Sequence, residues 1–573
     1  MPATSLAPAV VRFASFEVDF RSRELRKRGM RIRLEEKPFQ ILELLLRMPG
    51  ELVTRKVLRE SLWPDTFVGY ERSLNTAVNK LRGLLGDSAQ SPRFVETLSR
   101  RGYRFIAPVE RKIPSEGRRK MLAVLPFENL AADDTQELFG DGLTDELIAN
   151  LGQLDSKRLG VIARTSAVQY KRTTKSIAEI AAELNVDYVL EGSVRREGVQ
   201  VRITAQLIES REQTHLWSAS YDRRPGDILR VQQEVASEVS RALSLKLLPP
   251  PGCQSVHPEA HEAYLRGRFF WGKRNEESLV KAIKSFEHSL SIEPGCARSF
   301  SGIADCLGLL CWFGALSPRD AGEKASAAAT RAVELDPSRS EAHASLGLVR
   351  FWYQWDWKGA EEEFLRAIEL NSSYATAHQW YAAYLGAMGR LDEAREELVR
   401  ARETDPLSVV IRMNAADPLF FGRQYDRAIE HLRALLDHEP CFAPALFNLG
   451  RVCVQKGMYE DAIRAFDQAL EWSGNREGDC ALAHALGLAG RSNEARKILR
   501  ESTGRRDGRY LASPLIARIH LGLGETEQAI EWLRKGIEER SFWCVFLNAD
   551  PVYDEIRAEP RFQELLRLMR FQS

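Results

Sequence analysis

The sequence lacks several features that would place it in well-defined protein classes. Its eight cysteines form no Cys-x-x-Cys pair, which is typical of buried thiols in a reducing compartment. No apolar run approaches the roughly 20 residues that a membrane-spanning helix needs. The first ten residues, MPATSLAPAV, lack the charged start and apolar core of a signal peptide. We therefore expect a soluble, cytoplasmic protein without a membrane segment.

Residue patterns typical of catalysis are also missing. The sequence has no Gly-rich phosphate loop, nucleophile elbow or Cys/His constellation, so we expect no enzymatic activity and no cofactor. His257 and His261 have the spacing of metal ligands on a helix, but no third ligand follows nearby. A group of acids fits no known metal-binding loop, and acids are also common at helix starts: Asp133, Asp134, Asp141 and Asp145. We expect no metal site.

Charge is distributed unevenly along the 573 residues. A chain of this length is too long for one core, so three to five domains are expected. The net charge is +1, yet residues 11–112 hold 22 Lys and Arg against 13 Asp and Glu. A basic module in a nearly neutral chain indicates a polyanionic partner for that module.

The order of predicted elements in this basic module is sheet, three helices and hairpin. Alternating segments between residues 13 and 34 predict a small antiparallel sheet. Helices are expected within residues 36–51, 54–64 and 71–87, and Thr54 is the expected N-cap of the second. Residues 94–109 read as two strands around an Arg-Arg-Gly turn. This order predicts a winged helix-turn-helix whose third helix enters a major groove of DNA.

The third predicted helix has one apolar stripe and one unusual polar stripe. The apolar stripe consists of Leu74, Ala77, Val78, Leu81 and Leu85. The opposite side and its flanks carry Arg72, Thr76, Asn79, Lys80 and Arg82. Acids occur only at the two ends of this helix. Such a side is either an ordinary solvated surface or a surface for phosphates and base edges. The second basic element, the hairpin with arginines at its tip, favours DNA binding.

Residues 11–110 resemble the OmpR/PhoB-type effector domain through four motifs: KPFQILELLL, PGELVTRKVLRESLW, ERSLNTAVNKLRGLLGD and VETLSRRGYRF. The resemblance implies a bacterial transcriptional regulator that binds double-stranded DNA. We expect no receiver domain before residue 11 and no membrane helix like that of CadC-like relatives. The implied DNA contacts are Arg72, Ser73, Thr76, Asn79, Lys80, Arg82, Thr97, Arg100 and Arg101. The family also contacts RNA polymerase through the loop that here contains Asp65, Thr66, Phe67 and Val68.

A linker at residues 111–119 is expected to lead into a small α/β domain at residues 120–248. Strands and helices alternate there, which predicts helices packed on one mixed sheet. The region resembles the N-terminal domain of TolB-like proteins through AVLPFENL, FGDGLTDELI, VIARTS, LNVDYVLEGSVRR and VRITAQLI. This resemblance implies a fold more firmly than a function.

Residues 257–540 contain a counted repeat. Alanines recur at intervals of 33 or 34 residues, at 360, 394, 428, 462, 495 and 529, with earlier units around Ala282 and Ala325. This period is that of tetratricopeptide repeats, with two antiparallel helices in each of eight units. The repeats predict an α-α superhelix whose groove binds a protein or peptide partner, and residues 541–573 are expected to form a polar-faced cap of helices. The array could instead only dimerise the chain or space its domains. Trp352, Trp355 and Trp357 are either interface anchors or core.

The sequence as a whole predicts a multidomain, mainly α protein: winged helix, small α/β domain and repeat superhelix. We expect a sequence-specific transcriptional regulator whose α/β and repeat modules receive a signal, bind a partner or form a homodimer. The alternative is a repeat scaffold in which the basic domain is only a weak, non-specific nucleic-acid tether.

Overall fold

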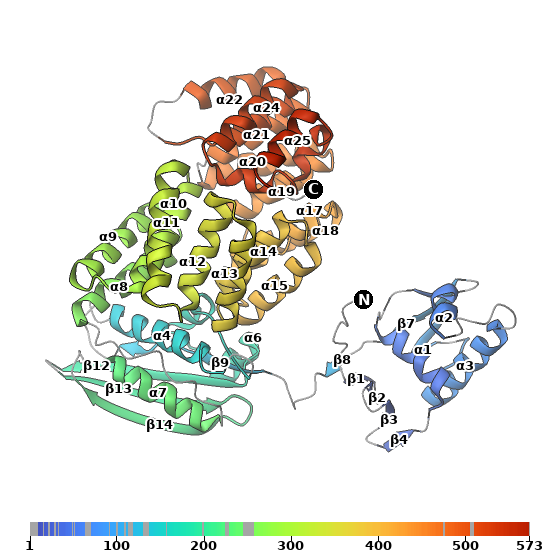
Figure 1. The fold of residues 1–573 in the computed structure, drawn as a ribbon. Coiled ribbons are helices and arrows are strands. Elements are labelled where there is room, and N and C mark those ends of the chain that lie inside the picture. Colours follow the sequence, from blue (N-terminus) through green and yellow to red (C-terminus); the bar gives the residue numbers. More distant parts are fainter. Residues whose placement is uncertain are drawn as a thin grey trace. The chain divides into compact units, whose positions relative to one another are not determined.

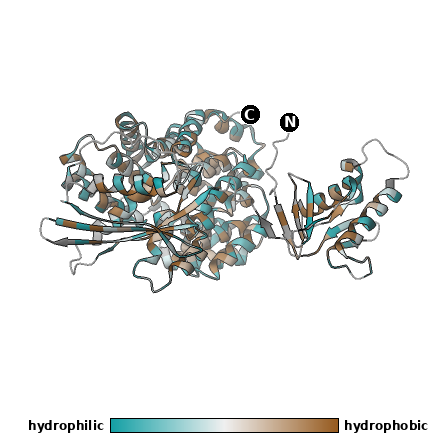
Figure 2. Ribbon diagram, turned by 90° about the horizontal axis from the view of Figure 1, so that it is seen from below, coloured by the Kyte–Doolittle hydropathy of each residue, from teal (hydrophilic) through white to brown (hydrophobic). Residues whose placement is uncertain are grey.

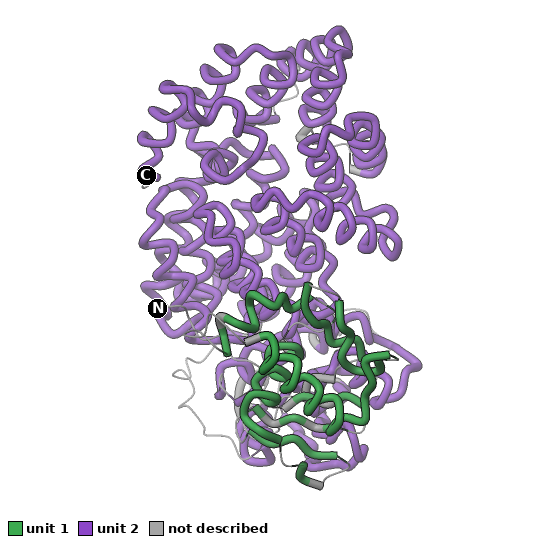
Figure 3. The backbone as a smooth tube through the Cα atoms, turned by 90° about the vertical axis from the view of Figure 1, so that its right-hand side faces the viewer, with its two compact units in different colours: residues 1–118 green, residues 119–573 purple. Residues whose placement is uncertain are grey.

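The structure, a computed structural model, divides into two compact units. It describes residues 10–571 except 15, 21–22, 28–29, 33, 48–49, 51, 63–69, 91, 99–100, 108–109, 113–118, 130–136, 156–157, 198–199, 224–227, 244–256, 474–475 and 505–508. Unit 1 comprises residues 1–118 and unit 2 residues 119–573 (Figure 3). Each unit has its own hydrophobic core.

Unit 1 has the predicted order of sheet, three helices and hairpin. Its sheet has the strand order β4-β3-β2-β1-β8 and is formed by β1 (Val10–Phe13), β2 (Phe16–Asp19), β3 (Glu24–Lys27), β4 (Met30–Ile32) and β8 (Glu110–Lys112). The helices are α1 (Glu36–Arg47), α2 (Arg55–Leu62) and α3 (Tyr70–Leu85). The hairpin of β6 (Val95–Leu98) and β7 (Gly102–Phe105) is joined by β5 (Val53–Thr54). Strand β8 includes two residues expected to begin the linker, because Val10 pairs with Lys112 across the sheet.

The local signals in unit 1 act as the sequence predicts. The Thr54 hydroxyl caps α2 by accepting a hydrogen bond from the Val57 backbone at 3.2 Å. Every member of the predicted apolar stripe of α3 is buried, from Leu74 to Leu85. Five phenylalanines are buried in the same core, and the rings of Phe13 and Phe105 lie 4.9 Å apart. The buried stripe fixes which side of α3 faces outward.

Unit 2 begins with a mixed sheet that has helices on both faces. Its strand order is β11-β9-β12-β13-β14, with β9 parallel to both neighbours and β12, β13 and β14 antiparallel. The strands are β9 (Lys120–Val124), β10 (Glu128–Asn129, on β12), β11 (Leu159–Val161), β12 (Tyr188–Glu197), β13 (Gln200–Glu209) and β14 (Thr214–Arg223). Helices α4 (Glu137–Gly152) and α7 (Ile228–Ala242) share one core with the sheet, and α6 (Ile177–Leu184) belongs to a second core. Hydrophobic and hydrophilic positions alternate along the long strands (Figure 2).

The rest of unit 2 is a stack of antiparallel helix pairs (Figure 1). In the described part of the array the pairs are α8 (Pro258–Gly272) with α9 (Glu276–Ile292), α10 (Ala297–Trp312) with α11 (Pro318–Leu335), α12 (Ser340–Val349, continued by the single turn η4, Arg350–Gln354) with α13 (Trp357–Leu370), α14 (Ala375–Ala387) with α15 (Leu391–Thr404), α16 (Val409–Asn414) and α17 (Asp417–Phe421) with α18 (Tyr425–Leu436), α19 (Ala443–Gln455) with α20 (Tyr459–Ser473), α21 (Arg476–Leu488) with α22 (Ser492–Gly504), and α23 (Ser513–Gly522) with α24 (Thr526–Glu538). These eight pairs agree with the predicted repeat count.

The repeat alanines explain why the period is so regular. All eight are fully buried on the second helix of their pair: Ala282, Ala325, Ala360, Ala394, Ala428, Ala462, Ala495 and Ala529. Only a small side chain fits where two helices approach closely. The same holds on the first helix, where a Cβ atom on Gly450 would lie 2.5 Å from the Phe466 ring.

The residues that follow α24 have an exposed polar side, as a polar-faced cap would, and an apolar side that is buried. They form two short 3-10 turns, η5 (Phe542–Phe546) and η6 (Pro551–Ile556), and the helix α25 (Pro560–Leu568). Phe542, Cys544, Tyr553 and Phe562 are at most 1% exposed. Two acids of the segment pair with arginines of the array: Asp550, which is buried, pairs with Arg518, and Asp554, which stays partly exposed, pairs with Arg423.

Candidate nucleic-acid interface

The exposed side of α3 carries most of the predicted contact residues. The side chains of Arg72, Ser73, Thr76, Asn79 and Lys80 are all exposed. The Thr76 hydroxyl donates to the Arg72 carbonyl at 2.8 Å, and the Lys80 ammonium pairs with Glu35 at 2.8 Å. Within the described part of the chain, the side chains of Arg72, Ser73 and Asn79 have no hydrogen bond or ion pair. Their polar groups are therefore open to an external ligand.

Arg82 is placed differently from the expectation. Its side chain is 6% exposed and donates hydrogen bonds to the Val95 carbonyl at 2.6 Å and the Thr97 hydroxyl at 2.8 Å. A buried guanidinium needs such acceptors, and both belong to the hairpin. In this structure Arg82 joins α3 to the hairpin, while Thr97 itself stays exposed.

Asp87 holds the loop that connects α3 to the hairpin. One carboxylate oxygen accepts from the Arg93 backbone at 2.7 Å, and the other accepts from the Val95 backbone at 2.8 Å. The sequence interpretation had treated Asp87 only as an acid at a helix end. The available signal was its position directly after Gly86, which ends the helix at φ +68°, because Asp and Asn often organise such turns through their side chains.

A second missed contact joins α3 to the other hairpin strand. The Tyr103 hydroxyl donates to the Asn75 side chain at 2.9 Å, and the Arg55 guanidinium lies over the Tyr103 ring at 5.5 Å. Burial raises the pKa of Tyr103, so it remains a neutral donor. Gly102 allows the close approach of β7 to β5, since a Cβ atom there would lie 2.1 Å from the Val53 carbonyl. The helix and the hairpin are thus held as one surface.

The hairpin tip contributes one exposed cation to the described surface. Arg101 is exposed, and its backbone closes the turn by donating to the Leu98 carbonyl at 2.9 Å. Arg104 pairs with Glu96 on the facing strand at 2.6 Å, so its charge is largely compensated. Arg100 lies outside the described residues, as do Asp65, Thr66, Phe67 and Val68 of the expected polymerase-contact loop.

The potential metal ligands are engaged elsewhere. Asp141 pairs with Lys171 and Asp145 with Arg164, both at 2.8 Å, while Asp133 and Asp134 lie outside the described residues. Burial lowers the pKa of His261. Nowhere in the described residues do three or more His, Cys, Asp or Glu side chains gather as they would around a metal ion. Of the described helices, none has both the length and the hydropathy to cross a membrane.

The α/β domain and the repeats of unit 2 are joined by polar contacts. The Ser166 hydroxyl donates to Asp405 at 2.6 Å, and the Ala163 backbone donates to the Thr404 carbonyl at 2.6 Å. Glu146 on α4 pairs with Arg298 on α10. These contacts fix the α/β domain against the array, so the two modules behave as parts of one unit.

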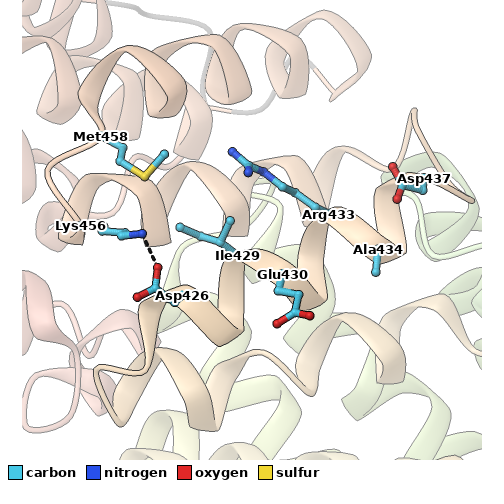
Figure 4. Close-up of a pocket in the computed structure, with 8 residues that line it drawn as sticks. All are labelled: Asp426, Ile429, Glu430, Arg433, Ala434, Asp437, Lys456 and Met458. Carbon is cyan, nitrogen blue, oxygen red and sulfur yellow. Dashed lines mark hydrogen bonds and ion pairs between the residues drawn. The ribbon is translucent and has the colours of Figure 1, made fainter.

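One open pocket of about 460 Å³ lies on the array (Figure 4). It is lined by Asp426, Ile429, Glu430, Arg433, Ala434, Asp437, Lys456 and Met458. Lys456 and Asp426 pair across it. The pocket has the mixed composition of an ordinary surface between repeats, and we assign it no function.

Three groups of family models match the chain. Residues 29–105 match "Transcriptional regulatory protein, C terminal", and residues 118–238 match "HilA/YgeH-like transcriptional regulator, second domain". Residues 423–487 and 515–541 match tetratricopeptide repeats. The region expected to be TolB-like is thus matched by a HilA/YgeH-like domain, and the TolB-like resemblance stays a prediction.

Individual relatives share parts of the chain. It is 37% identical over 239 residues to the putative adenylate cyclase 3 of Rhizobium meliloti, covering 40% of each protein. It is 25% identical over 389 residues to the transcriptional regulator HilA of Salmonella typhimurium, covering 66% of this chain and 67% of HilA. The solved DNA-binding domain of Klebsiella pneumoniae RstA, in complex with the RstA box, is 29% identical, with a TM-score of 0.16 over 17% of this chain and 96% of that one. The chain thus spans less than half of the first relative.

The predicted winged helix and repeat array are confirmed by the family models together with the fold. The sheet, the three helices and the hairpin lie where the first family model matches, and the helix pairs lie where the repeat models match. The chain therefore joins an OmpR/PhoB-type winged-helix DNA-binding domain to a HilA/YgeH-like second domain and a tetratricopeptide repeat array.

Proposed function

We propose that this protein is a sequence-specific transcriptional regulator that acts on promoter DNA in the cytoplasm. The observation that carries the proposal is the exposed side of α3, where Arg72, Ser73 and Asn79 have no partner within the described chain. An ordered helix that presents unpaired cations and amides matches the donors and acceptors of a major groove. Relatives named as regulators, among them HilA and a cholera toxin transcriptional activator, support the same function.

Each contact residue has a distinct proposed role. Asn79 is the candidate for reading a base edge, since amides bond bidentately to adenine. Arg72 and Lys80 would contact phosphates, and Thr97, Arg100 and Arg101 would reach the backbone beside the groove. Arg82 acts as a positioning residue through Thr97. We further propose that residues 65–68 contact RNA polymerase, on the family resemblance alone.

A salt titration separates a regulator from a scaffold with a non-specific tether. Binding of the full chain to pooled genomic fragments would be measured as salt is raised. A regulator retains a subset of fragments when the electrostatic contribution is suppressed. Uniform loss of binding to all fragments would favour the alternative, a repeat scaffold with a non-specific nucleic-acid tether.

We propose that the chain has no enzymatic activity. The support is the lack of a catalytic constellation in the sequence, although one relative is named a putative adenylate cyclase. The check is incubation of the purified chain with ATP and Mg²⁺ or Mn²⁺, followed by detection of cyclic AMP. Formation of cyclic AMP above a heat-treated control would contradict the proposal.

We also propose that unit 2 pairs two DNA-binding domains. A single winged helix buries little DNA surface, and linking two of them raises the effective concentration of the second. Unit 1 has its own core and can be tested alone. Band shifts would compare residues 1–118 with the full chain on one half-site and on paired half-sites, with masses measured by light scattering. If the full chain is monomeric and binds the paired half-sites no more tightly than residues 1–118 do, unit 2 does not pair DNA-binding domains. Its partner would then be a different protein.

A further inference from the structure

The inner face of the repeat array is covered by the chain's own residues 541–571. These residues contact side chains on or directly after the first helices of five repeats: Trp312, Trp352, Phe421, Arg451 and Arg518. Those repeats run from the second to the eighth. One short segment can reach first helices so far apart only along the side of the superhelix that they share, which is its concave side.

The two ends of the array also meet, which encloses this side. The Tyr510 backbone, before α23, donates to the Gly314 carbonyl, after α10, at 3.0 Å. Arg509 pairs with Glu276 on α9. The eighth repeat thus returns to the first and second, and the segment lies inside a closed array.

The first half of the segment binds through aromatic rings. The Phe542 ring contacts both Trp312 and Trp352, with centroid distances of 5.0 and 5.3 Å, and these two tryptophans also stack on each other at 6.0 Å. Phe546 stacks on Phe421 at 5.8 Å. Aromatic pairs at these distances stabilise beyond the area they bury. Of the three tryptophans that the sequence left undecided between core and interface, Trp352 contacts this segment through Phe542.

The second half of the segment binds through acids. Asp550 is 1% exposed and accepts hydrogen bonds from Arg518 at 2.8 Å and Arg451 at 3.0 Å. Asp554 accepts from Arg423 at 2.6 Å. Charge-assisted hydrogen bonds of this kind are stronger than neutral ones and specify geometry. Along the array, tryptophans are followed by arginines. Along the segment, the aromatic residues that contact the tryptophans are followed by the carboxylates that pair with the arginines.

We propose that the concave side of the array is a recognition surface for segments in which aromatic residues precede acidic ones, and that residues 541–571 are its resident ligand. An ordinary repeat cap contacts its neighbouring repeat, whereas Phe542 contacts Trp312, 230 positions earlier in the chain. Because the segment is tethered at Ser541, its effective concentration exceeds that of a free peptide. The intact chain therefore excludes external peptides from this surface.

The test severs the tether in the folded chain. A protease site is inserted between Arg540 and Ser541, where Arg540 is exposed in a turn with φ +56°. The full chain is folded, cut, and mixed with a fluorescent synthetic peptide of residues 541–571. Cys544 is a built-in reporter: it is fully buried, and burial raises the pKa of its thiol, so alkylation detected by mass spectrometry reports release.

We expect the intact chain to take up no labelled peptide and the severed chain to exchange its segment for it. A peptide carrying Asp550→Asn should bind at least about tenfold more weakly, because it loses charge on two charge-assisted bonds. The matched control Glu555→Gln alters an exposed carboxylate of the same segment that has no hydrogen bond or ion pair with the described residues, and this peptide should bind as well as the native one.

Three results would overturn the proposal. Labelled peptide that binds the intact chain as well as the severed one would show that the segment does not occupy the surface. A severed chain that never releases Cys544 to alkylation would make the segment part of the core. Loss of helical circular dichroism on release, without recovery when peptide is added back, would lead to the same conclusion.

Discussion

Arginine serves opposite purposes in the two units of this molecule. On α3 of unit 1, Arg72 is exposed and has no partner in the described chain. Inside the array of unit 2, Arg451 and Arg518 converge on one buried carboxylate. A guanidinium that an ordered helix holds in solvent has room for an external anion, whereas a buried one is matched within the fold because an unpaired buried charge is costly. The pairing and burial of the side chain, more than the residue type, distinguish Arg72 on α3 from Arg451 and Arg518 inside the array.

The largest expected effect is on stability, from removing the acid that two arginines share. Asp550→Ala leaves Arg451 and Arg518 without their buried carboxylate and should lower the free energy of unfolding of unit 2 by about 3–5 kcal/mol. Urea unfolding followed by circular dichroism measures it. Asp554→Ala, at a half-exposed position, should cost only about 0–1 kcal/mol. Equal effects of the two substitutions would show that burial does not decide how much an ion pair stabilises unit 2.

A pH effect should come from Asp405, at the contact between the α/β domain and the repeats. Burial raises the pKa of this carboxyl to about 6. Because the folded state holds the proton more tightly than the unfolded state, the stability from this group is lost as pH rises from about 4 to about 6. Asp405→Asn should therefore be more stable than the native chain at pH 7, by up to about 3 kcal/mol, and similar to it at pH 4.

Thermal midpoints of both proteins across this pH range provide the measurement. Asp437→Asn, at an exposed position of the array, is the matched control and should leave the native pH profile unchanged. If the thermal midpoint of Asp405→Asn changed with pH as that of the native chain does, this carboxyl would not titrate between pH 4 and 6.

A smaller, purely functional effect is expected on α3. Asn79→Ala should weaken binding to the preferred DNA site by about 1–3 kcal/mol and affect random DNA much less. Fluorescence anisotropy on both probes measures it, and the thermal midpoint should not change. Asn75→Ala is the control on the same helix, because Asn75 bonds to Tyr103 and its loss should lower stability. Equal losses on both probes would exclude base reading by Asn79.

The smallest expected effect concerns the hairpin tip. Arg101→Ala should weaken binding to all sequences and reduce the dependence of log K on log salt by about one unit. Arg104 already pairs with Glu96, so Arg104→Ala should leave this slope nearly unchanged. If Arg104→Ala changed the slope as much as Arg101→Ala, the ion pair would not compensate its charge.

Local and periodic signals made most of the fold predictable. The apolar stripe of α3, the Thr54 cap and the alanine period each depend on residues close in sequence, and the structure has all three. Contacts between distant residues could not be read in this way. Arg82 belongs to the polar side of α3 in any helical projection, and only the position of the hairpin turns it inward. The exposed polar side of α3 was predictable from residue type and spacing, whereas Asp87 and Asn75 act through partners that only the folded hairpin supplies.

Contacts between distant residues also determine the structure of the C-terminal segment. Asp550 and Asp554 contribute to the polar pattern that predicts a polar-faced cap. Their partners lie at positions 423, 451 and 518, and no spacing rule connects these positions. The aromatic residues of FWYQWDW were equally ambiguous until Phe542 was found beside Trp352.

Closure of the array by its last residues changes how the protein can fold during synthesis. Repeat arrays generally gain stability from neighbouring units and can grow as the chain emerges from the ribosome. Here the contacts of Phe542 with Trp312 and of Tyr510 with Gly314 join segments about 200 residues apart, and such non-local contacts slow folding. The early repeats must therefore wait, with their tryptophans uncovered, until translation reaches residue 542. A ribosome that stalls before that point leaves an open array displaying an aromatic face, a natural substrate for chaperones and proteases.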